Sequence, residues 1–488
     1  MTISAEGSRA ATANDDIVDV LGRRVRYRNV VAAVFVSALF LDILDTTIVN
    51  VALPSLGREF RTDAVEWVVL GYTLSLAVWI PVSGWLGDRV GTKRTFLFAL
   101  SVFIGASALC GAAQSIGQLV AFRALQGVGG GMLTPIGVAM LFRAFPPADR
   151  ARAATLIMIP TLAAPALGPI IGGLLVTHVG WRWIFYVNVP LGLIALAFGW
   201  RYLREHREPA AGRLDLPGFV LSGAGLASIV FSLSEGPRAG WTSSSVLLSG
   251  LVGVISFSAL VVVELRTRFP MLELRLLRNR MFRNANIVSL FSSGSFVGLI
   301  FLLPLYLQNL RGLSALESGL TTFPQAFGVL VSSQVAGRLY GAVGPRRLMF
   351  AGMLAAALSI SSFTFIGLDT DLWLIRGLIF VRGLCMGFAF VPMQASSYAT
   401  IAPADNGRAS SIFSTQRQMA ISLGIALVAT VLASYTTVGG EVRDPQRALT
   451  GFRVSFFVTA LLALAGAGAA LLVRDRDAAP TMRPRIET

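Results

Sequence analysis

Long apolar runs, separated by short polar and mostly basic segments, follow one another from residue 30 almost to the end of the chain. A helix of about 20 apolar residues spans the hydrocarbon core of a bilayer, so each run predicts a transmembrane helix. The predicted spans are 30–52, 66–87, 95–113, 117–142, 153–177, 184–204, 215–234, 244–264, 285–308, 317–338, 347–367, 373–396, 409–434 and 452–473. The pattern therefore predicts an all-α polytopic membrane protein of about fourteen transmembrane helices, grouped as six, two and six.

Composition supports a membrane protein and argues against a soluble one. Hydrophobic residues make up 54% of the chain and charged residues only 14%. A soluble globule could not cover so much apolar surface, whereas lipid accepts apolar side chains on the outside of a fold. The net charge of +15 comes from short basic clusters between the spans, which argues against nucleic-acid binding.

The grouping of the spans and the positions of the arginines predict domains and orientation. Most of the 41 Lys and Arg fall on one side if the N-terminus is cytoplasmic, so both termini are expected in the cytoplasm. Segment 265–284 carries arginines among apolar residues and is expected to form an amphipathic helix on the inner leaflet. The predicted parts are a cytoplasmic tail 1–29, a six-helix bundle 30–204, two linker helices with the amphipathic segment 205–284, a second bundle 285–473 and a cytoplasmic tail 474–488.

A motif after the second span, GWLGDRVGTKR at 84–94, is echoed by GRLYGAVGPRR at 337–347 with equal internal spacing. Such internal repeats are typical of secondary transporters, whose substrate path lies between two related halves. The first copy resembles the cytoplasmic loop motif of the major facilitator superfamily, which implies a contact that closes the inner side and breaks as the halves rock. The alternative is a basic loop that only follows topology rules. The resemblance assigns this conformational switch to Gly84, Asp88, Arg89, Gly91, Lys93 and Arg94.

The first span contains LDTTIVNVALP at 44–54, which resembles a motif of the fourteen-helix drug:proton antiporters within this superfamily. An ionised side chain inside lipid is costly, so Asp45 is expected to face a cavity or a partner. Asp42 lies three residues earlier, on the same helix face. Two nearby carboxylates resist joint ionisation, so one is expected to bind and release a proton during transport. For Asp42 a structural role is an equal alternative.

The fourth span contains RALQGVGGG at 123–131, which matches the RxxQGxG pattern of the superfamily. The resemblance implies that Arg123, with Gln126 on the same face, passes or tunes the proton. Arg123 could stabilise an ionised Asp45 if the two helix faces meet. The alternative is a structural arginine bonded to backbone carbonyls.

The fifth span resembles the antiporter motif of exporters in the superfamily, although Ala164 stands where a glycine is common. The small residues also suit plain helix packing. The residues that match this motif are Pro165, Gly168, Pro169, Gly172 and Gly173. A further motif of the same branch, WRWIFYVNVPLG at 181–192, is interpreted as a structural clamp at the outer end of the first bundle.

A set of aromatic, thioether and amide side chains could line a permissive substrate pocket, although such residues are also ordinary packing. These candidates are Tyr72, Trp79, Phe296, Phe323, Gln325, Met393 and Gln394. The second bundle has few charges in its spans and shows no acid in the middle of a span. Arg382 precedes Gly383 and Gly387, and these two glycines are interpreted as helix packing residues.

Several functional classes lack support in the sequence. No P-loop, Rossmann fingerprint or nucleophile elbow stands in a suitable setting, so ATP drive and enzyme activity are not expected. The two cysteines lie in apolar runs, and the two histidines lie far apart, so neither a metal site nor a cofactor is expected.

The resemblance implies a transporter in a bacterial inner membrane, surrounded by lipid, that exports hydrophobic compounds, cations among the candidates, in exchange for protons. A monomer is one candidate form, and the oligomeric state stays open. A dedicated exporter of one metabolite, antibiotic or lipid shares the same motifs and stays open. An importer and a non-transporting membrane sensor or enzyme are the remaining alternatives.

Overall fold

The computed structural model describes residues 17–20, 22–62, 65–208, 214–267, 270–436 and 445–482, and nearly all of them are helical. The first and last described segments lie on the same side of the helical bundle, here called the terminal end, because Arg28 pairs with Asp149 and the segment Asp475–Thr481 contacts Pro147–Asp149. The predicted all-α polytopic fold is confirmed. In the described part of the chain, thirteen helices are long and apolar enough to cross a membrane, against about fourteen predicted spans.

The first half of the chain forms α2 (Tyr27–Phe60), α3 (Glu66–Val90), α4 (Thr92–Ala112), α5 (Ile116–Ala144), η1 (Pro147–Asp149), α6 (Arg150–His178), α7 (Trp183–Tyr186) and α8 (Asn188–Tyr202). Two further helices follow, α9 (Leu216–Ala239) and α10 (Ser244–Arg266). The second half forms η2 (Leu274–Arg278), α11 (Arg280–Leu305), η3 (Tyr306–Leu310), α12 (Ala315–Thr322), α13 (Pro324–Val343), α14 (Pro345–Ser361), η4 (Ser362–Phe365), α15 (Leu372–Ser397), η5 (Pro403–Asp405), α16 (Asn406–Thr436), α17 (Pro445–Ala470) and η6 (Asp475–Thr481).

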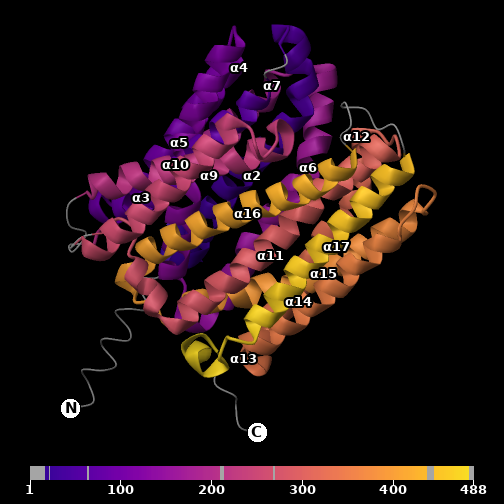
Figure 1. Ribbon diagram of the computed structural model, residues 1–488. Helices are drawn as coiled ribbons and strands as arrows, with labels where there is room; N and C mark the ends of the chain where they lie inside the picture. Colours follow the sequence, from indigo (N-terminus) through magenta and orange to yellow (C-terminus); the bar gives the residue numbers. More distant parts are fainter. Residues whose placement is uncertain are drawn as a thin grey trace, which may run out of the picture.

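Helix packing separates the two halves. In the first half α3 and α4 pack on α5, and α2 packs on α6; in the second half α13 and α14 pack on α15, and α11 packs on α16 and α17. Helices α9 and α10 pack on each other, and α9 also contacts α3 and α16. α9 therefore lies against both halves, as the adjacent ribbons of α3, α9 and α16 show in Figure 1, and α10 packs on α9.

The predicted span 317–338 is divided into two helices. α12 ends at Thr322, and α13 begins anew at Pro324, whose ring nitrogen cannot donate a helical hydrogen bond. Apolar content alone does not reveal this break. A second short element that the hydrophobic pattern did not predict is an antiparallel hairpin of β1 (Ile17–Val20) and β2 (Arg23–Arg26) before α2, with Gly22 at a φ of +79° in its turn.

The expectation of one amphipathic helix over 265–284 is wrong. α10 ends at Arg266, the short 3-10 helix η2 follows, and α11 begins at Arg280. The backbone N–H of Leu272 donates instead to Glu264 Oε1 over 3.1 Å, and the Glu273 carboxylate lies 3.8 Å from Arg408 on α16. These contacts tie the segment to the protein, so its backbone cannot keep a continuous helical hydrogen-bond pattern.

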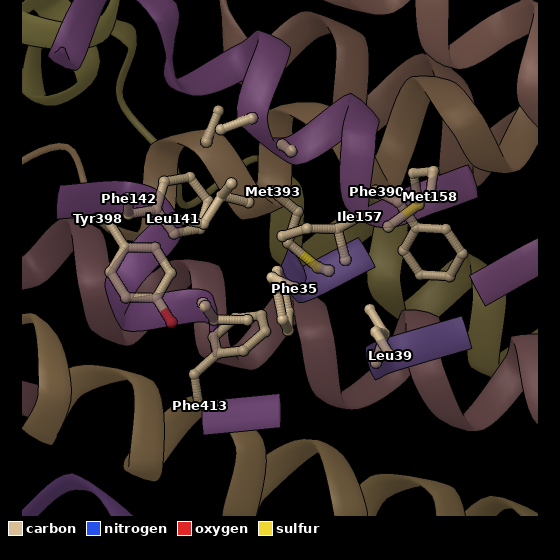
Figure 2. Close-up of a cluster of buried hydrophobic side chains, with 14 of the residues drawn as sticks. Phe35, Leu39, Leu141, Phe142, Ile157, Met158, Phe390, Met393, Tyr398 and Phe413 are labelled. Atoms are coloured by element: carbon tan, nitrogen blue, oxygen red, sulfur yellow. The ribbon is translucent and has the colours of Figure 1, made fainter. Parts of the chain in front are cut away.

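A buried apolar cluster joins the two halves. Figure 2 shows Phe35 and Leu39 of α2, Leu141 and Phe142 of α5, and Ile157 and Met158 of α6 beside Phe390, Met393, Tyr398 and Phe413 of the second half. The Phe142 and Tyr398 rings stack with their centroids 4.6 Å apart. Side chains from both halves therefore pack against one another at this level.

Candidate functional site

Asp45 lies at the centre of a buried polar network in the first half. Its Oδ2 atom is 2.5 Å from Arg123 Nη1, and both side chains are at most 1% exposed. Its Oδ1 atom accepts hydrogen bonds of 2.9 Å from Gln126 Nε2 and from Asn188 Nδ2. A buried carboxylate needs this combination of an opposite charge and further donors, because lipid and apolar side chains cannot solvate it.

The network also fixes the arginine. Arg123 Nη1 donates to Gln126 Oε1 over 2.6 Å, and its Nε donates to the carbonyl oxygen of Val68 over 3.1 Å. The guanidinium carbon lies 4.3 Å from the centre of the Tyr72 ring, a cation–π contact. The faces of α2 and α5 that carry Asp45 and Arg123 thus meet, and one backbone carbonyl completes the arginine's contacts.

Two members of the network were missed by the sequence analysis. Asn188, which begins α8, was assigned only to the structural clamp, and Ser107 of α4 was not considered. Ser107 Oγ lies 2.5 Å from Gln126 Nε2 and 3.3 Å from Asn188 Nδ2. An amide next to a buried carboxylate on another helix cannot be recognised from spacing, because its partner is set by packing between helices.

Asp42 has different partners although it lies one helical turn from Asp45. It accepts a hydrogen bond from the Tyr72 hydroxyl, and its side chain is buried. It also interacts electrostatically with Arg417 of α16, in the second half. Arg417 was missed as well, although a lone arginine inside the apolar run 409–434 could have suggested it. Asp42 thus faces the other half of the molecule.

The loop motif lies against α16 at the terminal end. The backbone N–H of Gly84 donates to Ser411 Oγ over 2.9 Å, and a Cβ atom at Gly84 would lie 2.6 Å from the carbonyl oxygen of Gly407. Only glycine permits this approach. Asp88 is buried beside it and interacts electrostatically with Arg143 and Arg408. Two members of the motif therefore hold the halves together.

The end of the loop motif is held by a carboxylate in each half. Gly91 has a φ of +118° at the start of α4, where the N–H groups of Lys93 and Arg94 donate to Glu205 over 3.1 and 3.2 Å. The N–H of Arg346, at the start of α14, donates to Asp475 over 2.9 Å. The internal repeat thus extends to these caps, whereas the Arg89 side chain points to the exposed surface.

A cavity of about 410 Å³ lies between the halves, away from the terminal end. It is lined by residues of α2, α6, α11, η3, α12, α13 and α15. Of the pocket candidates, Phe296 and Gln325 line this cavity, as does Pro165 of the antiporter motif. The lining residues are Thr47, Asn50, Val51, Thr161, Pro165, Phe296, Leu299, Ile300, Leu303, Pro304, Gln308, Ser318, Gly319, Thr322, Gln325, Ala326 and Ile379.

The other pocket candidates lie elsewhere. Trp79 packs on Phe219 of the extra helix α9 with ring centroids 5.7 Å apart, and Phe323 packs on Phe327 at 5.3 Å. Met393 accepts a hydrogen bond from Ser292 in the apolar cluster of Figure 2, and Gln394 is buried one residue further along α15. In this conformation these residues do not line the cavity, and neither does Tyr72.

The antiporter motif brings α6 close to α2. A Cβ atom at Gly168 would lie 2.8 Å from Thr47 Cβ, and one at Gly172 would lie 2.9 Å from Ile48 Cγ1. Gly173 faces open space, and the side chain of Pro169 lies outside the described residues. The glycines of α6 therefore fit against the turn of α2 that follows Asp45.

Arg382 is the counterpart of Arg123 in the second half, but no carboxylate of the described residues binds it. It is fully buried, with Nη1 2.5 Å from Gln325 Oε1 and Nη2 2.9 Å from the carbonyl oxygen of Phe296. Its guanidinium carbon lies 5.1 Å from the centre of the Phe296 ring. The sequence analysis assigned no role to Arg382, which the structure shows as a buried positive charge directly behind the cavity wall.

No group of three or more His, Cys, Asp or Glu that could hold a metal ion occurs in the described part of the chain. Both cysteines are buried thiols, and Cys110 lies 3.8 Å from Gln126 Oε1 at the edge of the polar network. The network is thus built from hydrogen bonds and one ion pair.

Comparison with known proteins identifies the family. The sequence profile of the Major Facilitator Superfamily matches residues 35–425 and 286–487. The chain belongs to this superfamily. It is therefore a multi-pass membrane transporter and not an enzyme. The resemblance found in the loop and helix motifs is confirmed at the level of the family.

Relatives in this superfamily cover most of the chain. A Multidrug resistance protein B homolog of Mycobacterium tuberculosis is 34% identical over 82% of this chain and 75% of its own length. Multidrug resistance protein 3 of Bacillus subtilis is 29% identical over 82% of this chain and 78% of its own length. The crystal structure of the human organic anion transporter MFSD10 superposes with a TM-score of 0.64 at 15% identity, covering 89% of this chain and 99% of that one, which supports the fold alone.

For a major facilitator transporter, the contacts define which end is closed. At the terminal end Arg150 of α6 donates to the Tyr398 carbonyl oxygen, and Ser410 Oγ of α16 donates to that of Pro135 over 2.6 Å. Thr155 Oγ1 lies 3.3 Å from the carbonyl oxygen of Ser333. The halves are joined at the terminal end, and the cavity lies toward the opposite end.

Proposed function

We propose that the chain is a proton-coupled antiporter that exports hydrophobic small molecules across a bacterial inner membrane. The observation that carries this proposal is the network of Asp45, Arg123, Gln126 and Asn188, which holds one carboxylate inside the membrane-spanning bundle. The names of the relatives, several of which are multidrug resistance proteins, support the substrate class. The chain needs no cofactor in this scheme, because a proton gradient drives each cycle.

The network gives protonation a structural consequence. While Asp45 is ionised it receives three donors, and these hold α2, α5 and α8 together. A proton on the carboxylate removes the charge that Arg123 neutralises and replaces one acceptor site with a donor, so the present hydrogen bonds no longer fit. Because α2 also packs on α6 and contributes Asn50 and Val51 to the cavity, a change at Asp45 is transmitted to the substrate path.

The orientation follows from charge and from the closed end. The terminal end carries the basic loops and both ends of the described chain, so we place it in the cytoplasm under the positive-inside rule. The present conformation is then closed toward the cytoplasm, with its cavity toward the outside. The chain contains both halves of the transport unit, which supports a monomer embedded in lipid as the functional form.

The experiment uses inverted membrane vesicles that contain the protein. An imposed proton gradient should drive accumulation of fluorescent hydrophobic compounds, and adding these compounds should release protons. Asp45→Asn should abolish both responses when the signal is normalised to the amount of inserted protein. Glu59→Gln is the matched control, because it removes an exposed carboxylate of the same helix that lies 3.3 Å from Arg182.

Full coupled transport by Asp45→Asn would contradict the proposed role of Asp45. Accumulation without proton movement in the unaltered protein would contradict proton coupling. Transport of one metabolite or lipid, with no response to a broad panel of compounds, would favour the dedicated exporter.

A further inference from the structure

The described lining of the cavity lacks the acidic side chains that a binding site for cations would need. The cavity wall in the described residues contains no Asp or Glu, and its apolar part is formed by Leu299, Ile300, Leu303 and Pro304 with the Phe296 ring. A lipophilic cation in such a cavity would have no countercharge at its surface. The lining therefore suits an amphipathic compound whose polar group is not a cation.

The strongest polar feature of the wall is Gln325. Its Oε1 atom accepts from Arg382 Nη1 over 2.5 Å, and an arginine has only donors, so the amide oxygen must face the arginine. The Nε2 group then points away from Arg382 and makes no hydrogen bond to the described residues. Because Gln325 lines the cavity, this N–H₂ group, polarised by a buried guanidinium, is available to a ligand.

Most other polar groups of the lining already use a donor within the protein. The Thr47 hydroxyl donates to the Leu44 carbonyl over 2.9 Å, and Thr161 donates to Ile157 over 2.8 Å. Gln308 Nε2 donates to Ser318 Oγ over 3.4 Å. The amide group of Gln325 is therefore the hydrogen-bond donor that lies beside the buried charge of Arg382. It lies at one side of a cavity whose other lining residues are neutral.

The charged side chains around the cavity also favour a ligand that is not a cation. The charged side chains in the interior of the two halves include the buried carboxylates of Asp42 and Asp45, the buried guanidinium groups of Arg123 and Arg382, and the half-buried Arg417, which interacts electrostatically with Asp42. With all five ionised one positive charge is in excess, and each bound proton increases that excess. No carboxylate of the described helices interacts with Arg382, so its charge acts on the cavity without compensation nearby.

We propose that this cavity takes amphipathic anions, such as lipophilic carboxylates or sulfonates, with the acid group at the Gln325 amide in front of Arg382. This proposal rests on the proposed function in taking the cavity as the substrate site. It differs from the cationic compounds that the sequence resemblance implies. The aromatic or aliphatic part of the ligand lies against Phe296 and the apolar residues of α11.

Three dansyl compounds with one fluorophore test the charge preference: dansylglycine is an anion, dansylamide is neutral and dansylcadaverine is a cation. Binding is measured by fluorescence titration of the full-length protein in lipid nanodiscs, with empty nanodiscs as the blank. We expect dansylglycine to bind at least about tenfold more tightly than dansylcadaverine. Equal or tighter binding of the cation, or no binding of dansylglycine, would overturn the proposal.

Variants test the assigned residues. Gln325→Leu should weaken dansylglycine binding about tenfold and leave dansylamide binding nearly unchanged. Gln308→Leu is the matched control, because it removes an amide from the same cavity away from Arg382 and should leave the ratio of the two affinities unchanged. An unchanged ratio in Gln325→Leu would remove Gln325 from the site.

Arg382→Gln should bring the affinities of anion and cation close together. If that variant fails to fold, Gln325→Glu compensates the charge of Arg382 with a carboxylate and should likewise remove the preference for dansylglycine. Transport in proteoliposomes separates this proposal from the proposed function. Transport of dansylglycine without proton movement would contradict proton coupling and leave the anion site intact. Proton-coupled transport of dansylcadaverine, with no transport of dansylglycine, would contradict the anion site and leave proton coupling intact.

Discussion

The ion pair between Asp45 and Arg123 makes a quantitative prediction for stability. Arg123→Leu leaves the Asp45 carboxylate buried with only the two amide donors of Gln126 and Asn188. Removing one partner of a buried pair costs about 3–5 kcal/mol, because the remaining charge is no longer compensated. Protein domains are stable by only about 5–15 kcal/mol, so the variant should lose a large part of its stability.

The double variant Arg123→Leu/Asp45→Asn separates the pair from general packing. The amide introduced by Asp45→Asn has no charge to compensate and could still accept from Gln126 or Asn188. We therefore expect the double variant to recover about 2 kcal/mol or more relative to Arg123→Leu. The assay is thermal unfolding of the purified protein in detergent, followed by intrinsic tryptophan fluorescence. If the two side chains were not coupled, the losses of stability in Arg123→Leu and in Asp45→Asn would add up in the double variant. A double variant that shows this full sum would refute the argument.

Three further predictions concern the contacts between and within the halves. Gly84→Ala should reduce transport at least about tenfold, because the added Cβ would lie 2.6 Å from the Gly407 carbonyl oxygen. The control is Gly105→Ala on α4, where the added Cβ faces open space. Equal transport by the two variants would contradict the importance of the contact at Gly84. Arg417→Gln should disturb proton coupling through Asp42, so that fewer protons are released per substrate molecule transported. Arg417→Lys should keep part of this coupling, because it keeps the positive charge. An unchanged number of protons per substrate molecule in Arg417→Gln would exclude this role. Glu205→Gln should lower the free energy of unfolding by about 1 kcal/mol, because it weakens the cap of α4, and an unchanged thermal midpoint would contradict that assignment.

The sequence by itself determined that the protein lies in a membrane and which family it belongs to. It also predicted about fourteen spans, against thirteen membrane-spanning helices in the described part of the chain. Continuous apolar runs of about 20 residues, without a polar face, are stable as helices only in lipid. A carboxylate or an arginine inside such a run needs a polar or charged partner. Both deductions are local, because they depend on single spans. They were sufficient to select Asp45 and Arg123 as site candidates, and the internal repeat located the loop motif in both halves.

Only the tertiary structure decided which partner each of these groups has. Asp42 and Asp45 lie on one helix face, yet Asp45 bonds to α5 and α8 while Asp42 faces Arg417 on α16. The sequence also could not place Asn188 beside Asp45, nor assign Gln325 to Arg382. Such pairings depend on the rotation and crossing of helices far apart in the chain, which spacing along one helix does not encode.

The same reason explains the local errors. The break before Pro324 and the non-helical segment before η2 lie where contacts to other elements replace helical hydrogen bonds, as Glu264 does for Leu272. The cavity is a tertiary feature as well, because its walls come from both halves. Hydrophobicity determines which segments enter the membrane, and packing between those segments determines where charge, hydrogen-bond donors and open space meet.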